Sequence, residues 1–175
     1  MNNPVVIVGS GIAGLNFALK MAEKFEVLLL TKSELKESNT YYAQGGIASV
    51  MGEHDSFESH IEDTLKAGSF HNNKEMVEFM VKNGPDAIED LIANGAEFDI
   101  DDGYLALARE GGHSANRIVH KADHTGREIE LALISKVKAN PRIKVQINTF
   151  AADVIVRDNK VVGLEYISEG KLNFA

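Results

Sequence analysis

The sequence lacks cysteine entirely, which excludes a disulfide scaffold and metal sites built from thiolates. It lacks any apolar run near the roughly 18 residues that a membrane-spanning helix needs. It also lacks a basic run, and its formal net charge is −8, so we expect neither nucleic acid nor an anionic membrane surface as a partner. An anionic substrate stays compatible with this charge, because a local cluster of Arg and His can form a positive pocket in an acidic protein.

The residues that are present have the composition of a folded protein of ordinary size. Hydrophobic residues make up 44% of the chain and charged residues 25%, which is typical of a globular protein. The 175 residues are enough for one domain. The first expected strand begins near Val5, which leaves no room for a signal peptide and predicts a cytoplasmic location.

A strand, a helix and a second strand are predicted at the start of the chain. The continuous β-branched run Val5–Val8 indicates a strand that is buried on both faces of a parallel sheet. The helix at 12–23 has an apolar face with i, i+3, i+4, i+7 spacing, formed by Leu15, Ala18, Leu19 and Ala22. The run 27–31 is the second buried strand, and this order predicts a right-handed parallel crossover.

Two long polar loops interrupt the pattern, at 32–52 and 110–124, and loops of this length inside a compact domain are usually functional. Helices are predicted at 56–67, 74–82, 86–93 and 125–139. Strands are predicted at 98–101, 104–108, 143–147, 153–157 and 161–167. Thr125 and Glu128 have the spacing of a capping box, and Asp102-Gly103 and 158–160 are typical of hairpin turns.

These elements predict the α/β class, with a Rossmann-like βαβ unit, inserted helices and a C-terminal β-hairpin. A Rossmann-type sheet normally has more strands than this unit and this hairpin supply. We therefore expect residues 1–175 to be the N-terminal portion of a larger domain.

The segment Gly9-Ser10-Gly11-Ile12-Ala13-Gly14 has the G-x-G-x-x-G form of a dinucleotide-binding turn. Its first glycine permits the tight turn out of the strand, the second lets the backbone approach a pyrophosphate, and the third lets the helix pack closely on the strand. Backbone N–H groups and the helix dipole then face the phosphate charge. Because the motif follows a strand and opens a helix, we interpret it as a nucleotide site rather than a purely structural turn.

The second predicted strand ends in a way that departs from the usual NAD fingerprint. Thr31 and Lys32 stand where an acidic residue would accept a hydrogen bond from the ribose hydroxyls. Without that carboxylate, plain NAD binding becomes a poor fit to this turn.

Two later segments carry a more specific signal than the glycine turn. The first is Asn39-Thr40-Tyr41-Tyr42-Ala43-Gln44-Gly45-Gly46, whose final glycines let backbone amides approach a flat, partly anionic ring. The second contains Arg109-Glu110-Gly111-Gly112-His113-Ser114 and, further on, Asp123-His124-Thr125-Gly126-Arg127-Glu128.

With the glycine turn, these segments resemble the L-aspartate oxidase branch of the succinate dehydrogenase and fumarate reductase flavoprotein family, from Val5 to about Gly163. The resemblance implies FAD as cofactor and oxidation of L-aspartate to iminoaspartate, with electrons passed to oxygen or fumarate. It also implies a place in quinolinate and NAD biosynthesis, and hence a functional link to quinolinate synthase.

The resemblance assigns FAD contacts to the glycine turn (Gly9, Ser10, Gly11, Ile12, Ala13 and Gly14), to Lys32 and to the segment Asn39 to Gly46. Relatives with covalent flavin carry a histidine where this chain has Asn39. We therefore expect FAD to be bound non-covalently.

Glu110 and His113 are the residues that the resemblance places against substrate. Relatives that act only on dicarboxylates have a non-acidic residue at the Glu110 position, whereas aspartate has an α-ammonium that a carboxylate can pair with. The alternative for Glu110 is a solvated loop carboxylate. The proton-transferring arginine, the capping domain and the C-terminal helical domain are expected beyond residue 175, so we assign no catalytic residue here and expect residues 1–175 alone to be inactive.

Two other functional readings stay open. One is a non-catalytic FAD-binding fragment or truncated gene product, and the other is a fragment of a fumarate reductase or succinate dehydrogenase flavoprotein. Glu110 and Asn39 argue against the second.

Several polar residues are weaker candidates. His113, His120 and His124 do not follow a recognised ligand pattern, so we expect no metal. Tyr41 and Tyr42 would pack on the flavin or simply anchor their loop, and Ser114 is a further candidate for contact with substrate or flavin. Carboxylate recognition and surface or helix-terminal roles are both compatible with Arg109, Arg117 and Arg127.

Overall fold

The structure is a computed structural model that describes residues 3–175, and it contains two compact units. The first unit comprises the chain up to Tyr42 and from Ile129 onward, and the second comprises Ala43–Glu128. No helix in the described part of the chain combines the length and apolarity that a bilayer crossing requires.

A parallel three-stranded sheet organises the first unit, with strand order β1-β2-β8. Its strands are β1 (Val5–Val8), β2 (Val27–Leu30) and β8 (Ile143–Gln146). Val27 at the start of β2 pairs with Val5 on one side and with Ile143 on the other. The predicted parallel pairing of the first two strands is confirmed.

Burial differs between the two predicted strands. The central strand β2 is buried along its whole length, as a run of apolar residues predicts. The expectation that β1 is buried on both faces is wrong, because Val8 is 56% exposed. Strand β1 lies at the edge of the sheet within the described residues, so only one neighbour covers it.

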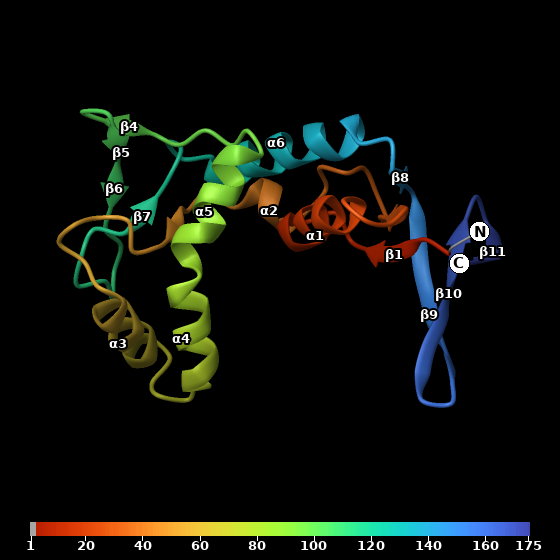
Figure 1. Cartoon of the computed structure of the whole chain (residues 1–175), viewed down its shortest axis with the longest axis horizontal. Helices are drawn as coiled ribbons and strands as arrows, with labels where there is room; N and C mark the ends of the chain where they lie inside the picture. Colours follow the sequence, from red (N-terminus) through yellow and green to blue (C-terminus); the bar gives the residue numbers. More distant parts are fainter. Residues whose placement is uncertain (1–2) are drawn as a thin grey trace. The chain divides into compact units, whose positions relative to one another are not determined.

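Helices and a second sheet complete the first unit (Figure 1). The helices are α1 (Ile12–Ala22), α2 (Asn39–Tyr42) and α6 (Thr125–Ala139), of which the first four residues of α6 belong to the second unit. The antiparallel sheet has the order β11-β10-β9, from β9 (Thr149–Arg157), β10 (Lys160–Ser168) and β11 (Lys171–Phe174). Its long hairpin turns at Asp158 and Asn159, both with positive φ, as predicted. Strand β11 and helix α2 were not predicted.

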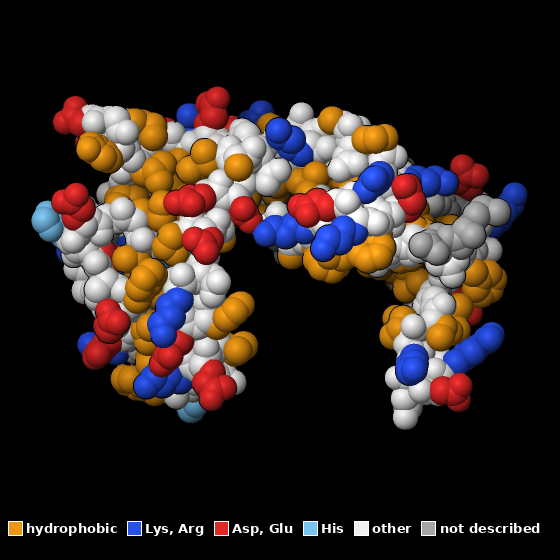
Figure 2. All heavy atoms as spheres, viewed as in Figure 1, with side chains coloured by type: hydrophobic (Ala, Val, Ile, Leu, Met, Phe, Trp, Pro, Cys, Tyr) orange, Lys and Arg blue, Asp and Glu red, His pale blue; other side chains and the backbone are white. Residues whose placement is uncertain are grey.

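The second unit is built from three helices and short strands. The helices are α3 (Phe57–Ala67), α4 (Lys74–Lys82) and α5 (Gly84–Ala93), close to their predicted bounds. The strands are β3 (Ile47–Ala48), β4 (Ile100–Asp101), β5 (Tyr104–Leu105), β6 (Leu107–Ala108) and β7 (Ile118–Val119). The predicted Asp102-Gly103 hairpin joins β4 to β5, but β6 leaves it to join the sheet β3-β7-β6. Figure 2 shows hydrophobic side chains on the surface of α4, where Met76, Phe79 and Met80 are exposed.

The predicted capping box at the start of α6 does not form. Thr125 Oγ1 accepts a hydrogen bond from the Lys121 N–H at 2.9 Å, rather than from Glu128. Glu128 Oε1 accepts instead from the Glu97 N–H at 3.2 Å. Both side chains therefore fasten neighbouring segments of the second unit to the helix start, a use that the local spacing could not reveal.

Candidate functional site

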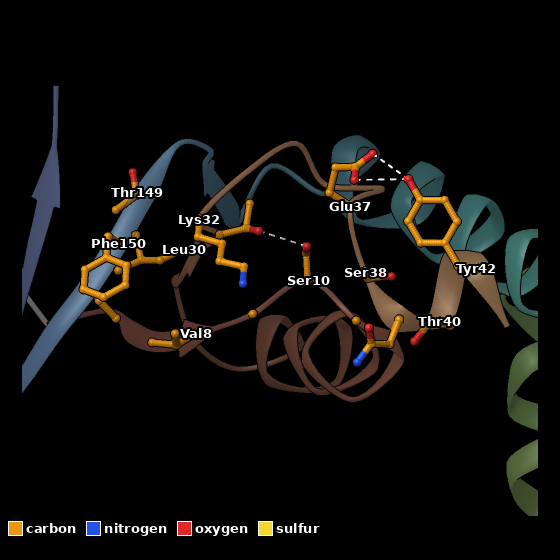
Figure 3. Close-up of a pocket in the computed structure, with 15 residues that line it drawn as sticks. Val8, Ser10, Leu30, Lys32, Glu37, Ser38, Thr40, Tyr42, Thr149 and Phe150 are labelled. Carbon is orange, nitrogen blue, oxygen red and sulfur yellow. Dashed lines mark hydrogen bonds between the residues drawn. The ribbon is translucent and has the colours of Figure 1, made fainter.

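A cavity of about 590 Å³ opens at the carboxyl ends of β1 and β2 in the first unit (Figure 3). Open α/β sheets bind their ligands at this edge, and the volume lies in the range of cofactor pockets. The predicted cofactor residues that line it are Gly9, Ser10, Gly11, Lys32, Asn39, Thr40 and Tyr42. Ile12, Ala13 and Gly14 form the first turn of α1, and Tyr41 lies in α2.

Each glycine of the turn has its own steric reason in the structure. Gly9 has φ +103°, a conformation that side chains other than hydrogen strongly disfavour. A Cβ at Gly14 would collide with the carbonyl oxygen of Gly9, so only glycine lets α1 start this close to β1. Gly11 caps α1 with no side-chain hydrogen bond, and the first turn of the helix contains no acidic residue. No acidic side chain of this turn therefore neutralises the positive end of the α1 dipole, which favours an anion.

The end of β2 explains the departure from the NAD fingerprint. Ser10 Oγ donates to the carbonyl oxygen of Leu35 at 2.9 Å, so Thr31 Oγ1 must donate the bond of 3.1 Å that joins it to Ser10 Oγ. Thr31 is buried and holds the glycine turn in place. Lys32 lines the cavity as a cation where the fingerprint has a carboxylate (Figure 3).

Helix α2 forms the other wall of this cavity. Ser38 Oγ caps it by accepting from the Tyr41 N–H at 3.1 Å. Thr40 Oγ1 accepts from the Ile12 N–H at 3.1 Å, which ties α2 to the start of α1. Tyr42 Oη donates to Glu37, and this hydrogen bond raises the pKa of Tyr42.

The rest of the predicted FAD segment belongs to the second unit, which also contains Glu110. Ala43, Gln44, Gly45 and Gly46 open this unit. Glu110 Oε1 lies 3.7 Å from the place that a Cβ on Gly45 would occupy, so segments 43–46 and 109–114 of this unit meet here. A Cβ on Gly46 would collide with Ile118 and Val119, which accounts for the second glycine.

Glu110 and His113 are the first and last residues of one tight turn. The His113 N–H donates to the Glu110 carbonyl oxygen at 3.2 Å, and Gly112 has φ +87°, as the third position of a type II turn requires. Glu110 is exposed. His113 Nδ1 is buried, and no described residue hydrogen-bonds to it. The structure thus brings the two predicted substrate residues of this loop together.

A buried ion cluster anchors the loop just after this turn, and the sequence analysis missed it. Arg117 is fully buried and binds both oxygens of Asp55 at 2.8 Å each, from Nε and Nη2. Its Nη1 donates to Asp63 Oδ2 at 2.9 Å. The expected surface or substrate-binding role of Arg117 is wrong, because its buried guanidinium is hydrogen-bonded to Asp55 and Asp63.

Ser114 joins the same cluster and has a structural role there. Its N–H and its Oγ each donate to Asp63 Oδ2 at 2.7 Å. Burial raises the pKa of Asp63, but the hydrogen bonds from Ser114 and the charge of Arg117 outweigh it and leave that pKa below its usual value. Asp55, Ser59 and Asp63 recur every four residues, with Asp55 just before the Ser56 N-cap and the other two on α3. This polar spacing indicates the cluster in the sequence.

His60 packs beside His113 in this unit. The two rings meet edge to face with centroids 6.3 Å apart. Burial and the nearby Arg117 lower the pKa of His60, so it is neutral at pH 7. His60 Nδ1, like His113 Nδ1, is buried without a hydrogen-bond partner among the described residues.

The weaker candidates lie elsewhere in the second unit. His120 Nδ1 lies 3.2 Å from Asp99, and His124 Nδ1 lies 3.2 Å from Asp123. A hydrogen bond from the Ala122 N–H lowers the pKa of Asp99, and one from His124 lowers that of Asp123. Arg109 lines a separate cavity of about 420 Å³. Among residues 3–175, no group of three or more metal-ligating side chains converges.

Glu130 is a second residue that sequence analysis missed. It is fully buried in the first unit and accepts from Ser38 Oγ at 2.8 Å. Burial raises the pKa of its carboxyl to about 7, and the hydrogen bond from Ser38 offsets this only in part.

The cavity fits FAD by its own geometry. Its glycine turn offers backbone amides and a helix N-terminus to a pyrophosphate, with close approach secured by the glycines. Lys32 adds a positive charge, and Asn39, Thr40 and Tyr42 add polar groups along the wall.

Comparison with known proteins gives the same answer. The profile of the family described as "FAD binding domain" matches residues 4–173. L-aspartate oxidase 2-b, chloroplastic, of Nicotiana tabacum is 52% identical over 150 residues, which are 85% of this chain and 23% of that protein. L-aspartate oxidase of Yersinia pestis is 44% identical over 162 residues, which are 90% of this chain and 30% of that protein.

Solved structures agree with this assignment. Sdh1 of Mycobacterium smegmatis, in complex with UQ1, has a TM-score of 0.91 and 31% identity over 98% of this chain and 32% of its own. The E. coli quinol fumarate reductase FrdA with an E245Q mutation has a TM-score of 0.90 and 31% identity over 97% of this chain and 30% of its own. The chain spans about a quarter to a third of the length of these relatives. It belongs to the FAD binding domain family, it is similar to the N-terminal part of L-aspartate oxidases and of these flavoproteins, and its cofactor is FAD.

Proposed function

We propose that this chain supplies the FAD-binding part of an L-aspartate oxidase, which oxidises L-aspartate to iminoaspartate and passes electrons to oxygen or fumarate. The curated relatives named above, at 44% to 52% identity, support this choice. When bound, FAD would accept the hydride of the substrate Cα–H bond, while the amino nitrogen loses a proton and the Cα=N bond of iminoaspartate forms. The chain's own residues would bind and orient the substrate.

The position of the Glu110 carboxylate is the observation on which the proposal rests. Its carboxylate is exposed at the head of a tight turn and lies beside Gly45 of the predicted flavin segment. An ammonium group paired with it would gain a charge-assisted hydrogen bond of roughly 1.5–3 kcal/mol. Aspartate has such a group, whereas succinate and fumarate do not.

The rigidity of this turn favours a substrate-orienting role over a solvated loop. Ser114 and Arg117 both donate to Asp63 on α3, and the buried Arg117 also pairs with Asp55 just before that helix. His113 would contribute the buried side of the same substrate contact. A site held on such a support keeps its geometry without the substrate.

The test is to load the chain with FAD and titrate L-aspartate and fumarate separately under anaerobic conditions, following the visible flavin spectrum. We expect Glu110→Gln to raise the Kd for L-aspartate about tenfold or more, the loss of one charge-assisted bond, and to change the Kd for fumarate less than twofold. Glu89→Gln removes the same charge from an exposed position on α5 and should change neither value. An equal loss for both ligands would refute the role of Glu110.

Flavin bleaching by L-aspartate in the same experiment measures whether residues 1–175 can oxidise the substrate. The resemblance places the proton-transferring arginine outside these 175 residues, so we expect binding with little or no bleaching. Rapid bleaching would show that residues 1–175 suffice for the chemistry.

Non-covalent attachment of FAD is part of the proposal. Asn39 lines the cavity and has no nucleophilic side chain for a flavin ring. Denaturing the yellow protein and passing it through a small-pore filter should release all of the flavin. Colour retained with the unfolded chain would contradict this.

A second candidate is a succinate dehydrogenase or fumarate reductase flavoprotein, favoured by the two solved structures with 31% identity. Succinate would then perturb the flavin spectrum as strongly as L-aspartate does. A chain that binds FAD but neither dicarboxylate would instead be a binding module without catalysis.

The finer biological setting is likewise proposed. Oxidation of L-aspartate would place the protein in NAD biosynthesis, before quinolinate synthase. We propose a cytoplasmic location, although the name of the tobacco relative contains the word chloroplastic.

A further inference from the structure

Glu130 lies on the buried face of α6, where the neighbouring side chains are apolar. It lies on the same face of α6 as Leu133, Ile134 and Val137, at i, i+3, i+4, i+7 spacing, and all four are buried. A carboxyl group is costly in such surroundings unless it makes a hydrogen bond that matters. A leucine would fill this position better if packing were all that it provided.

The one hydrogen bond that this carboxyl makes among the described residues leads directly to the cofactor cavity. Glu130 Oε1 accepts from Ser38 Oγ at 2.8 Å, and Oε2 is buried without a hydrogen-bond partner. Ser38 Oγ also accepts from the Tyr41 N–H at 3.1 Å, so the same hydroxyl caps α2. Because the Ser38 hydroxyl donates its hydrogen to Glu130, an Oγ lone pair is left pointing at the Tyr41 N–H.

Helix α2 needs this support because it has only four residues. A single helical turn gains too few hydrogen bonds to stand alone in water. Thr40 reaches from it to the Ile12 N–H, and a Cβ on Gly11 would lie 3.4 Å from Thr40 Oγ1. In Figure 3, Ser38 and Thr40 lie at the Tyr42 end of the cavity, opposite Thr149 and Phe150.

We propose that Glu130 is a positioning residue for the cofactor site, which holds Ser38 and, through it, the α2 wall against the glycine turn. The inference rests on the proposed use of this cavity for FAD. It assigns a binding role to a buried group that touches neither the cavity nor any predicted substrate contact. A glutamine could fill this role, because its amide oxygen accepts the same hydrogen bond.

The first experiment measures the Kd for FAD by quenching of flavin fluorescence at pH 6. Loss of the cap support should cost about fivefold to tenfold in affinity in both Glu130→Leu and Ser38→Ala. Because the two residues act in one chain of hydrogen bonds, the double variant should lose no more than the worse single variant. Glu130→Gln should stay within about twofold of the unmodified chain.

Leu133→Ala is the matched control, since Leu133 lies on the same helix face and is also fully buried. It should lower the melting temperature and leave the Kd for FAD unchanged. An unchanged Kd in Ser38→Ala, or losses that multiply in the double variant, would overturn the inference.

A second measurement does not depend on FAD at all. Hydrogen exchange of the Tyr41 amide in the cofactor-free chain should speed up by about fivefold in both Ser38→Ala and Glu130→Leu, and stay unchanged in Glu130→Gln and Leu133→Ala. If the unmodified chain fails to bind FAD while this pattern appears, the proposed function fails and the positioning role stands. If FAD binds and the Tyr41 amide is insensitive to Glu130, the positioning role fails alone.

Discussion

Single glycines control how closely α1 can approach β1. Gly14 faces the carbonyl oxygen of Gly9, and any added carbon there would collide with it. Gly111 in the second unit has open space around its Cβ position and does not have a positive φ. Comparing alanine substitutions at these two positions therefore distinguishes a steric clash in the turn from the general effect of replacing a glycine.

Gly14→Ala should therefore lower the free energy of unfolding by about 1–3 kcal/mol, because α1 must shift away from the strand. FAD affinity should fall with it. Gly111→Ala should change stability by less than about 0.5 kcal/mol. Urea denaturation of both variants gives the comparison, and equal stabilities would contradict the steric argument.

Glu130 should make the stability of the first unit depend on pH. Its pKa rises from 4.5 to about 7 on folding, so the folded state binds the proton more tightly than the unfolded state. The resulting stabilisation is fully present below about pH 4.5 and is lost as the pH rises through about 7. At about 1.4 kcal/mol per pKa unit, the loss amounts to roughly 3 kcal/mol.

Glu130→Gln has no proton to release and should lack this component. Compared with the unmodified chain, the variant should gain relative stability between pH 5 and pH 8. Urea denaturation at four values of pH across this range measures the difference. Parallel stability curves for the two proteins would show that the carboxyl does not titrate in this window.

Among the elements, α3 is distinguished by its polar residues rather than by its apolar face. Arg117, Asp55 and Asp63 form hydrogen bonds of 2.8–2.9 Å with side chains that are 0%, 1% and 12% exposed. Lys66 and Glu62 on the same helix are 2.9 Å apart but are mostly exposed. Equal distances thus occur with very different solvent access.

Arg117→Met should lower the free energy of unfolding by about 3–5 kcal/mol, since it leaves two carboxylates buried without their cation. Lys66→Met breaks a pair of the same length in water and should cost less than about 1 kcal/mol. Chemical unfolding of the two variants side by side checks this. A similarly small loss of unfolding free energy in both variants would mean that burial does not strengthen the contribution of the Arg117 ion pairs to stability.

Much of the fold could be predicted from periodicity, because helices α1, α4 and α5 and strand β2 bury apolar residues at the spacing that their sequence shows. What escaped prediction depends on partners that are distant in sequence. The capping box at Thr125 gave way to Lys121, and the edge position of β1 exposes Val8. Strand β11 has only four residues, Lys171–Phe174, too short a segment to be recognised without its neighbour β10.

The candidate site divides in the same way. The glycine turn follows from a local pattern, the other cofactor residues were assigned from the family resemblance, and seven of the fifteen line one cavity. The supporting residues Glu130 and Arg117 do not follow, since charged residues are normally assigned to the surface. Applied to polar residues as well, helical spacing predicts that Glu130 lies on the buried face of α6 and that Asp55, Ser59 and Asp63 lie on one side of their segment.

For the molecule as a whole, the cofactor cavity lies inside one unit, so FAD should stabilise that unit by mass action. At a free FAD concentration of 100 times its Kd, the free energy of unfolding should rise by about 2.7 kcal/mol. Slower hydrogen exchange should accompany it around β1, α1 and α2. Urea denaturation with and without FAD measures the first effect, and an unchanged midpoint would contradict a cavity of this kind.

The strand order of the parallel sheet also sets the order in which the molecule can fold. Strand β2 pairs with β8, and the whole of the second unit lies between them in the chain. Closing so long a loop costs entropy before any pairing repays it, which makes this step slow. On the ribosome, β9, β10 and β11 follow β8 and can form their hairpins from neighbouring residues. The cavity at the end of β2 therefore matures late, and a nascent chain released before Ile143 should emerge without the ability to hold its flavin.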